Sequence, residues 1–260
     1  MVGGTSMGAI LGAQVGMERD WEEILRTSRA TFVTPRPFRK YTLPLVSLLR
    51  HGVFDASAAA TFGGAHLEDL WTPSFCVATN LSTAEPFVFL RGPAAEAALA
   101  SSALPGIVTP RIRSGHLLVD GGVLANTPTD TMQRFCTVLI VSDATEGRAV
   151  EADFDAFPSP WHLLGRRLSP VHEEAEVPGL MSILTRTAVL GSIANDARAR
   201  DAADLYLRMP VDAFGMLEMD RIDEIVEAGY AYSRNALEAG RAGGADAPWY
   251  PRIMGKAVEA

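Results

Sequence analysis

A serine flanked by glycines lies close to the start of the sequence. Gly4-Thr5-Ser6-Met7-Gly8 matches G-x-S-x-G, in which a sharp turn between a strand and a helix presents a serine hydroxyl as a nucleophile. We expect glycine at both flanks because a side chain there would collide across the turn. If Ser6 begins a helix, the helix dipole and the backbone amide of Met7 would face a developing oxyanion. A purely structural glycine-rich turn is the alternative interpretation.

A second pattern, Asp120-Gly121-Gly122, supplies a candidate base. A serine hydroxyl is a weak nucleophile until a base takes its proton. Asp120 ends the apolar run HLLVD, which places its carboxylate at the carboxyl end of a strand, where α/β sheets carry their sites. An ordinary aspartate has a pKa of about 3.9, so we expect burial to raise the pKa of Asp120. By itself the pattern is more typical of a hairpin or turn, and only the fold could bring it to Ser6.

Histidine offers a different hydrolase. In the chain order serine, acid, histidine, either Asp120 or Asp143 would be the acid and His162 or His172 the base. Both histidines lie in a proline-rich stretch, where a solvated histidine is the common case. That fold also needs several strands before its nucleophile, and only five residues precede Ser6.

Alternating strands and helices must position these residues. Apolar runs predict strands, and capping and composition signals predict helices. The expected strands are 1–4, 74–80, 86–91, 116–120, 137–142 and 205–209, and the expected helices are 6–17, 20–32, 94–102, 179–203 and 220–239. This order predicts an α/β fold, with a hairpin between the second and third strands. The proline-rich stretches 34–44 and 149–177 are expected to be irregular.

Composition excludes several classes of protein. The 260 residues include 23 Lys and Arg against 31 Asp and Glu, a net charge of −8, so a nucleic-acid-binding face is not expected. The two cysteines, Cys76 and Cys136, lie in apolar runs and are predicted to be reduced core thiols. No run is long enough to span a membrane and no signal peptide is evident. We expect a soluble cytoplasmic protein.

Three segments carry a resemblance to a known family. Taken in order, the sequence resembles the patatin-like phospholipase family, and most closely its bacterial branch related to neuropathy target esterase. The segments are GGTSMGAI at 3–10, SSALPGIVTP at 101–110 and VDGGVLANTP at 119–128, with further similarity at 36–50 and 70–82. The resemblance implies a three-layer α/β/α domain with a mostly parallel sheet over residues 1–240, followed by a loose tail at 241–260.

The resemblance also implies a chemistry. In this family a G-x-S-x-G serine and a D-G-G aspartate form a dyad without histidine that hydrolyses acyl esters of phospholipids, lysophospholipids or neutral lipids. Carried over, Ser6 is the nucleophile and Asp120 the general base, with no metal or cofactor. The amide of Met7 is the expected oxyanion donor, Gly121 and Gly122 allow close backbone approach, and Asn126 is expected to hold backbone groups after the base.

One departure from the family pattern concerns the oxyanion hole. The family forms it largely from a glycine-rich loop on a strand some tens of residues before the nucleophile, and this sequence has no such loop before Ser6. We therefore expect that Met1 is an internal methionine. The alternative is a non-catalytic protein that keeps the motif residues and binds lipid or a partner without turnover.

A basic, aromatic segment stands out on this acidic chain. Arg36, Phe38, Arg39, Lys40 and Tyr41 lie together between prolines. Such a cluster could touch anionic headgroups near the active site, although a solvated loop with one or two buried rings is the more ordinary interpretation. The resemblance implies a lipid acyl-ester substrate, and this segment adds peripheral membrane contact as the less ordinary alternative.

Overall fold

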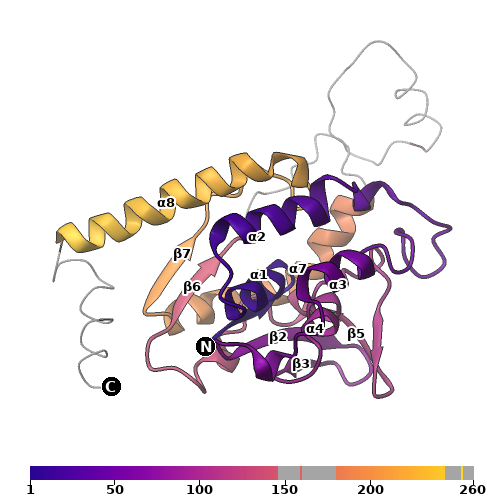
Figure 1. The fold of residues 1–260 in the computed structure, drawn as a ribbon, viewed down its shortest axis with the longest axis horizontal. Coiled ribbons are helices and arrows are strands. Elements are labelled where there is room, and N and C mark those ends of the chain that lie inside the picture. The colour runs from indigo at the N-terminus through magenta and orange to yellow at the C-terminus, as the bar shows by residue number, and fades with distance from the viewer. Residues whose placement is uncertain (146–158, 160–179, 244–252, 254–260) are drawn as a thin grey trace, which may run out of the picture.

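The computed structural model describes residues 1–145, 159, 180–243 and 253 (Figure 1). Its strands are β1 (Val2–Thr5), β2 (Ser74–Asn80), β3 (Glu85–Phe89), β4 (Arg111–Arg113), β5 (His116–Asp120), β6 (Ile140–Asp143) and β7 (Leu205–Arg208). Its α-helices are α1 (Met7–Gly16), α2 (Trp21–Ser28), α3 (Asp55–Phe62), α4 (Ala94–Ser101), α5 (Thr129–Met132), α7 (Leu180–Ala202) and α8 (Ile222–Gly243). Shorter turns are η1 (Arg29–Val33), η2 (Pro37–Arg39), η3 (Leu67–Asp69), η4 (Gly121–Val123) and η5 (Met219–Arg221).

The strands form two sheets flanked by helices. One sheet contains β1 to β5 and the other contains β6 and β7. The α/β class predicted from the sequence is confirmed, as is the hairpin between β2 and β3. Parallel pairings join β1 to β2 and β6 to β7. The strands β3, β4 and β5 enter antiparallel pairings, which the expectation of a mostly parallel sheet did not include, so the larger sheet is mixed.

The central strand β2 brings β1 and β5 end to end. On one edge, β3 pairs with residues 76–80 of β2. β1 pairs with 74–77 and β5 with 78–80. Because a strand has only two hydrogen-bonding edges and β3 overlaps both partners, β1 and β5 must share the other edge. They run in opposite directions along it, and their carboxyl ends meet.

Small residues let α1 and α4 lie close to this sheet. Ala9 and Ala13 of α1 and Ala97 and Ala98 of α4 are buried in one cluster with Cys76 of β2. A side chain at Gly12 of α1 would lie 3.3 Å from the Cα of Gly3 in β1, so glycine permits the close approach of helix and strand. The elbow that connects β1 to α1 is therefore held against a densely packed layer.

Several sequence predictions are resolved by the observed elements. The N-cap of α2 is Asp20, whose Oδ1 accepts a hydrogen bond from the Glu23 N–H at 2.8 Å, as its position predicted. The sequence prediction missed β4, α3 and α5. The helix α8 continues past residue 240, where the tail was expected to begin, and the rest of that tail and nearly all of 149–177 lie outside the described residues.

The two cysteines are unpaired, as expected. Cys76 is buried, and burial raises the pKa of its thiol to about 12, so it is an inert core residue. Cys136 is half-buried. Among the described helices, none combines the length and the apolar character needed to cross a membrane.

Candidate active site

Ser6 occupies a strained turn between β1 and α1. Its backbone has φ 55° and ψ −121°, a conformation that an L-residue rarely adopts and that the surrounding structure must impose. A side chain at Gly4 would lie 2.8 Å from the carbonyl carbon of Gly8, so the first glycine of the motif is sterically required. A side chain at Gly8 would meet no atom within 4 Å. The prediction that Gly8 avoids a collision is therefore wrong.

A buried serine that sequence reasoning missed holds this turn in place. The N–H of Ser6 donates to Ser101 Oγ at 2.9 Å, and Ser101 Oγ donates to the carbonyl of Val77 at 2.5 Å. Ser101 is the last residue of α4 and is fully buried. The hydroxyl thus ties the elbow to β2 and occupies the Ser6 amide. A serine at the end of an alanine-rich helix carries no sequence signal for this role.

Asp120 is the last residue of β5, which approaches the end of β1 from the opposite direction. Thr5, the residue before Ser6, is paired with Val77 of β2, and Asp120 is paired with the next residue, Ala78. Because β1 and β5 end at adjacent positions on one edge, the two motifs meet although 114 residues separate them. The sequence-predicted Ser6 and Asp120 are therefore neighbours.

The Asp120 carboxyl group is shielded from water. Its side chain is 2% exposed, and Oδ1 accepts a hydrogen bond from the N–H of Gly122 at 2.7 Å. Oδ2 is buried and forms no hydrogen bond of normal geometry with the described residues. Burial raises the pKa of Asp120 to about 6, against smaller lowering effects of the Ser6 hydroxyl and the Gly122 N–H. The direction agrees with the sequence expectation.

The turn after Asp120 fits tightly against β1 and β2. A side chain at Gly121 would overlap the carbonyl oxygen of Val77 and lie 2.9 Å from Thr5 Cγ2, so this position requires glycine. The Thr5 hydroxyl donates to the carbonyl of Ala125 at 2.7 Å, which binds the elbow to the second motif. Asn126 Nδ2 donates to the Thr145 hydroxyl at 2.6 Å. The expectation that Asn126 holds backbone groups stays a prediction.

Met7 begins α1, so its N–H is one of the donors that a helix leaves unpaired at its first turn. The first turn of α1 contains no acidic residue, and its positive end is therefore available to an anion beside Ser6. The role of Met7 as an oxyanion donor stays a prediction, because it depends on a bound substrate.

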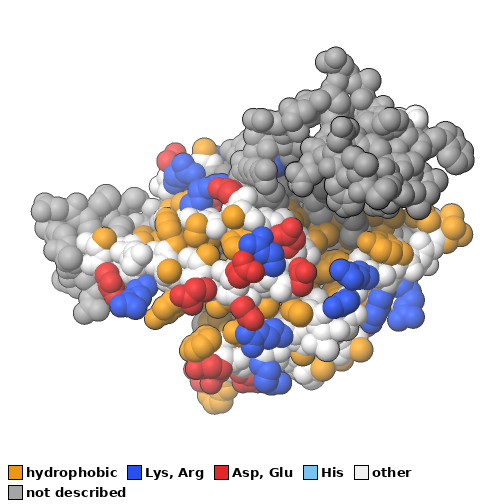
Figure 2. Space-filling model, turned by 90° about the horizontal axis from the view of Figure 1, so that it is seen from above, with side chains coloured by type: hydrophobic (Ala, Val, Ile, Leu, Met, Phe, Trp, Pro, Cys, Tyr) orange, Lys and Arg blue, Asp and Glu red, His pale blue; other side chains and the backbone are white. Residues whose placement is uncertain are grey.

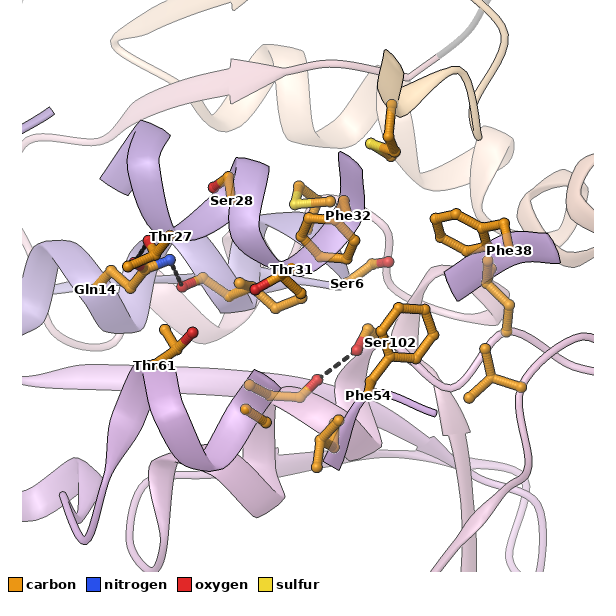
Figure 3. A pocket seen from close by; sticks show the side chains of 18 of the residues that line it. Ser6, Gln14, Thr27, Ser28, Thr31, Phe32, Phe38, Phe54, Thr61 and Ser102 are labelled. Atoms are coloured by element: carbon orange, nitrogen blue, oxygen red, sulfur yellow. Dashed lines mark hydrogen bonds between the residues drawn. The ribbon is translucent and has the colours of Figure 1, made fainter. Parts of the chain in front are cut away.

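An apolar cavity opens beside the nucleophile candidate. Its volume is about 120 Å³, it is open to solvent on one side, and Ser6 and Met7 line it. Figure 3 shows Ser6 between a polar end and an aromatic end of the cavity. The polar end contains Gln14, Thr27 and Thr61, and the aromatic end contains Phe38 and Phe54. A concave, mostly apolar lining with a few polar groups is typical of small-molecule sites.

Comparisons with known proteins identify the family of this chain. Residues 1–132 match the family model of the patatin-like phospholipases. The chain therefore belongs to the patatin-like phospholipase family. It is 30% identical to lysophospholipase nte1 of Aspergillus fumigatus over 248 residues, 92% of this chain and 16% of that protein. It is 29% identical to human patatin-like phospholipase domain-containing protein 6 over 243 residues, 90% of this chain and 18% of that protein. This patatin-like chain spans less than a fifth of either relative.

The histidine alternative gains no support from the described part of this patatin-like chain. None of its histidines lines the cavity that contains Ser6, and His162 and His172 lie outside the described residues. Asp143 is buried at the end of β6, where it accepts hydrogen bonds from the Thr145 N–H at 2.9 Å and the Tyr206 hydroxyl at 2.5 Å. Its contacts are those of a residue that fixes the loop after β6.

Replacing Asp120 with asparagine is expected to stabilise the fold at neutral pH. The folded-state pKa, about 6, lies above the ordinary value of 3.8, so the folded protein binds this proton more tightly than the unfolded chain. The associated stability is complete below about pH 4 and is lost as pH rises toward 6, because folding must then bury a charge. About two pKa units correspond to at most about 3 kcal/mol.

Urea denaturation at pH 4 and pH 7.5 tests this expectation. Asp120→Asn should exceed the parent chain in unfolding free energy by about 1–3 kcal/mol at pH 7.5, and the difference should shrink at pH 4. Asp130→Asn, which alters an exposed carboxylate, is the control and should show no such pH-dependent gain. An Asp120→Asn difference that is the same at both pH values would contradict the buried-charge argument.

Proposed function

We propose that this chain is a serine hydrolase of lipid acyl esters, of the phospholipase A or lysophospholipase type. The observation that carries the proposal is the meeting of Ser6 and Asp120 at adjacent positions of β2 beside an apolar cavity. A hydroxyl beside a buried carboxylate supplies a nucleophile and a base, and the cavity suits an acyl chain. The names of the relatives, which include a lysophospholipase, support the same substrate class.

In this reaction Asp120 relays a proton twice, once during acylation and once during deacylation. Its carboxylate takes the proton of the Ser6 hydroxyl as Oγ attacks the ester carbonyl carbon. The protonated carboxyl then gives that proton to the alcohol as the ester bond breaks, which leaves an acyl-serine. A water molecule, deprotonated by the same carboxylate, attacks the acyl-serine, and the fatty acid leaves as Ser6 regains its proton. A base with a pKa of about 6 is mostly ionised at neutral pH and strong enough to assist.

The negative oxygen of each tetrahedral intermediate requires donors. The Met7 N–H and the positive end of α1 are the expected local contribution. The resemblance to the family implies that further donors belong to a glycine-rich loop. Among the described residues, β1 pairs only with β2, and β6 only with β7. The carboxyl ends of β1 and β6 contact neighbouring residues of one loop. The Thr5 hydroxyl at the end of β1 donates to the Ala125 carbonyl, and the Thr145 hydroxyl after β6 accepts from Asn126 Nδ2.

Hydrolysis should depend on Ser6 and not on another serine of the same cavity. In Ser6→Ala, turnover of a lysophospholipid and of a chromogenic short-chain ester should fall by about 10³-fold or more, since acylation loses its nucleophile and no acyl-serine forms. Ser102→Ala is the matched control, because Ser102 also lines the cavity but donates its hydroxyl to the Ala98 carbonyl at 2.7 Å. Its rate should stay within about threefold of the parent. Mass spectrometry after a fluorophosphonate probe should find the label on Ser6.

The pH profile, measured in the parent chain and in two histidine variants, separates the dyad from a Ser-His-Asp hydrolase. Because the base must be ionised, kcat/KM should rise through an apparent pKa of about 6 and then level off. His162→Ala and His172→Ala should keep that profile. Loss of turnover in either histidine variant would instead support a Ser-His-Asp hydrolase. Lipid binding without turnover in the parent chain would support the non-catalytic alternative.

The polar end of the cavity predicts a limit on acyl-chain length. Gln14 is 1% exposed, and its Oε1 accepts hydrogen bonds from Thr27 Oγ1 at 2.6 Å and from Arg19 Nη1 at 3.3 Å. Arg19 Nη2 donates to the Thr61 carbonyl at 2.5 Å. This bonded cluster closes the end of the cavity with groups that already have partners, and a methylene chain gains nothing by displacing them.

The helix α1 sets the distance from Ser6 to the polar end of the cavity, and this stretch of the cavity is here called the acyl arm. Gln14 lies eight residues after Ser6 along α1, a rise of about 12 Å at 1.5 Å per residue. An extended chain advances by roughly 1.3 Å per carbon for C–C bonds of about 1.5 Å, so the arm holds about nine carbons. We expect hydrolysis of p-nitrophenyl esters to peak at acyl chains of about eight to ten carbons.

Gln14→Ala should move that optimum to longer chains by about two to four carbons, because it removes the end wall. Val108→Ala enlarges the cavity elsewhere, next to Phe38 and Phe54, and should leave the optimum unchanged. If Val108→Ala shifts the optimum and Gln14→Ala does not, the acyl chain occupies the aromatic end instead.

A further inference from the structure

A hairpin-like loop presents a row of apolar side chains to solvent. Within residues 40–50, here called the 40–50 hairpin, Tyr41 is 62% exposed, Leu43 72%, Leu45 83% and Val46 66%. Single exposed apolar residues are common on soluble proteins. Four within six positions form a contiguous patch, and contiguous patches mark sites of interaction.

The base of the hairpin is firmly anchored, so the exposure of its tip is built into the structure. Leu49 is fully buried, and the N–H groups of Leu48 and Leu49 donate to the carbonyls of Gly106 and Ile107, each at 2.9 Å. Across the hairpin, the N–H of Thr42 donates to the Leu48 carbonyl at 2.9 Å. These bonds hold the two arms of the hairpin together and leave its tip to project from the molecule (Figure 1).

Cations surround this apolar tip. Arg36, Arg39, Lys40 and Arg50 are exposed, and none forms an ion pair with another described residue. Residues 34–54 contain no Asp or Glu, although the whole chain carries a net charge of −8. Figure 2 shows basic and apolar side chains gathered at the end of the molecule where the hairpin projects in Figure 1. These four cations are here called the basic collar. An apolar tip with such a collar is complementary to an anionic lipid surface.

The hairpin also continues into the cavity. Phe38 and Phe54 lie just before and just after it in the chain, and both line the cavity together with Ser6. Their ring centroids are 5.5 Å apart. A surface bound by the hairpin would therefore lie next to the aromatic end of the cavity.

We propose that the 40–50 hairpin docks this protein on anionic bilayers. Leu43, Leu45 and Val46 enter the boundary between headgroups and acyl chains, and the basic collar binds lipid phosphates and carboxylates. Docking delivers a membrane lipid to the aromatic end of the cavity. Only this delivery rests on the proposed function, because binding of the hairpin to a bilayer requires no hydrolysis.

Vesicle sedimentation of the full chain tests the docking. All proteins carry Ser6→Ala so that the lipids stay intact, and the vesicles contain equal amounts of phosphatidylcholine and phosphatidylserine. The chain with Leu43→Ser, Leu45→Ser and Val46→Ser should bind at least about tenfold more weakly than the parent, because it loses most of the inserted apolar surface.

A matched control removes exposed apolar surface elsewhere. Trp21 and Trp71 are 65% and 81% exposed and lie near the carboxyl end of α1, far from Ser6 at its other end; Trp21→Ser with Trp71→Ser should leave vesicle binding unchanged. Replacing Arg36, Arg39 and Lys40 with Gln should weaken binding to the anionic vesicles by about fivefold per cation. The same change should have little effect on vesicles of phosphatidylcholine alone.

Three outcomes would overturn the proposal. They are binding by the hairpin variant equal to that of the parent, an equal loss in the tryptophan control, or a parent dimer in sedimentation velocity that the hairpin variant alone disrupts. Hydrolysis of a soluble short-chain ester, measured with Ser6 present, keeps the two proposals separate. The hairpin variant should retain this activity, whereas a parent chain that binds vesicles but hydrolyses no ester would refute only the proposed function.

Discussion

The whole site depends on one strand edge. Two strands that run toward each other cannot both continue along the same edge of β2, so β1 and β5 must each stop where the other ends. At that junction the chain leaves β1 through Ser6 and leaves β5 through Gly121. Thr5 and Gly121 then share a space too small for another side chain. The hydroxyl and the carboxylate are therefore brought together by backbone hydrogen bonding, which is far more rigid than contact between two mobile loops.

The same junction explains why the ionised carboxylate of Asp120 destabilises the fold. Backbone strands surround Asp120, and one of its oxygens is buried without a hydrogen bond of normal geometry. A fold selected only for stability would place a neutral group there, because a buried charge without a full set of partners costs free energy. The raised pKa of this carboxyl makes it a stronger base at neutral pH. Stability and reactivity are therefore opposed at this one residue, as is common at functional sites.

Sequence reasoning recovered the parts of the molecule whose signals are local. The strands at β1, β2 and β5, the capped start of α2 and the two glycine motifs all carry strong patterns within a few residues. It missed α3, whose alanine-rich sequence DASAAATF lacks an amphipathic period, and β4, which has only three residues. The family resemblance implied a mostly parallel sheet, yet whether β5 runs with or against β2 is decided by long-range pairing. The bond from Ser101 to the Ser6 amide and that from Asn126 to Thr145 are also long-range, and no local pattern specifies either partner.

The cavity shows how one helix can serve several purposes. At its first residue, α1 offers a positive end beside Ser6, and along one face it presents Met7, Ile10 and Gln14 to the cavity at helical spacing. Its opposite side is lined with alanine and glycine and rests on the sheet. Because a helix advances by a fixed length per residue, the distance from the nucleophile to the Gln14 cluster cannot change without a register shift against β1. Close packing at Gly12 and Gly3 opposes such a shift. The rigid contact between α1 and the sheet therefore fixes both the conformation of the elbow and the length of the acyl arm that extends from it.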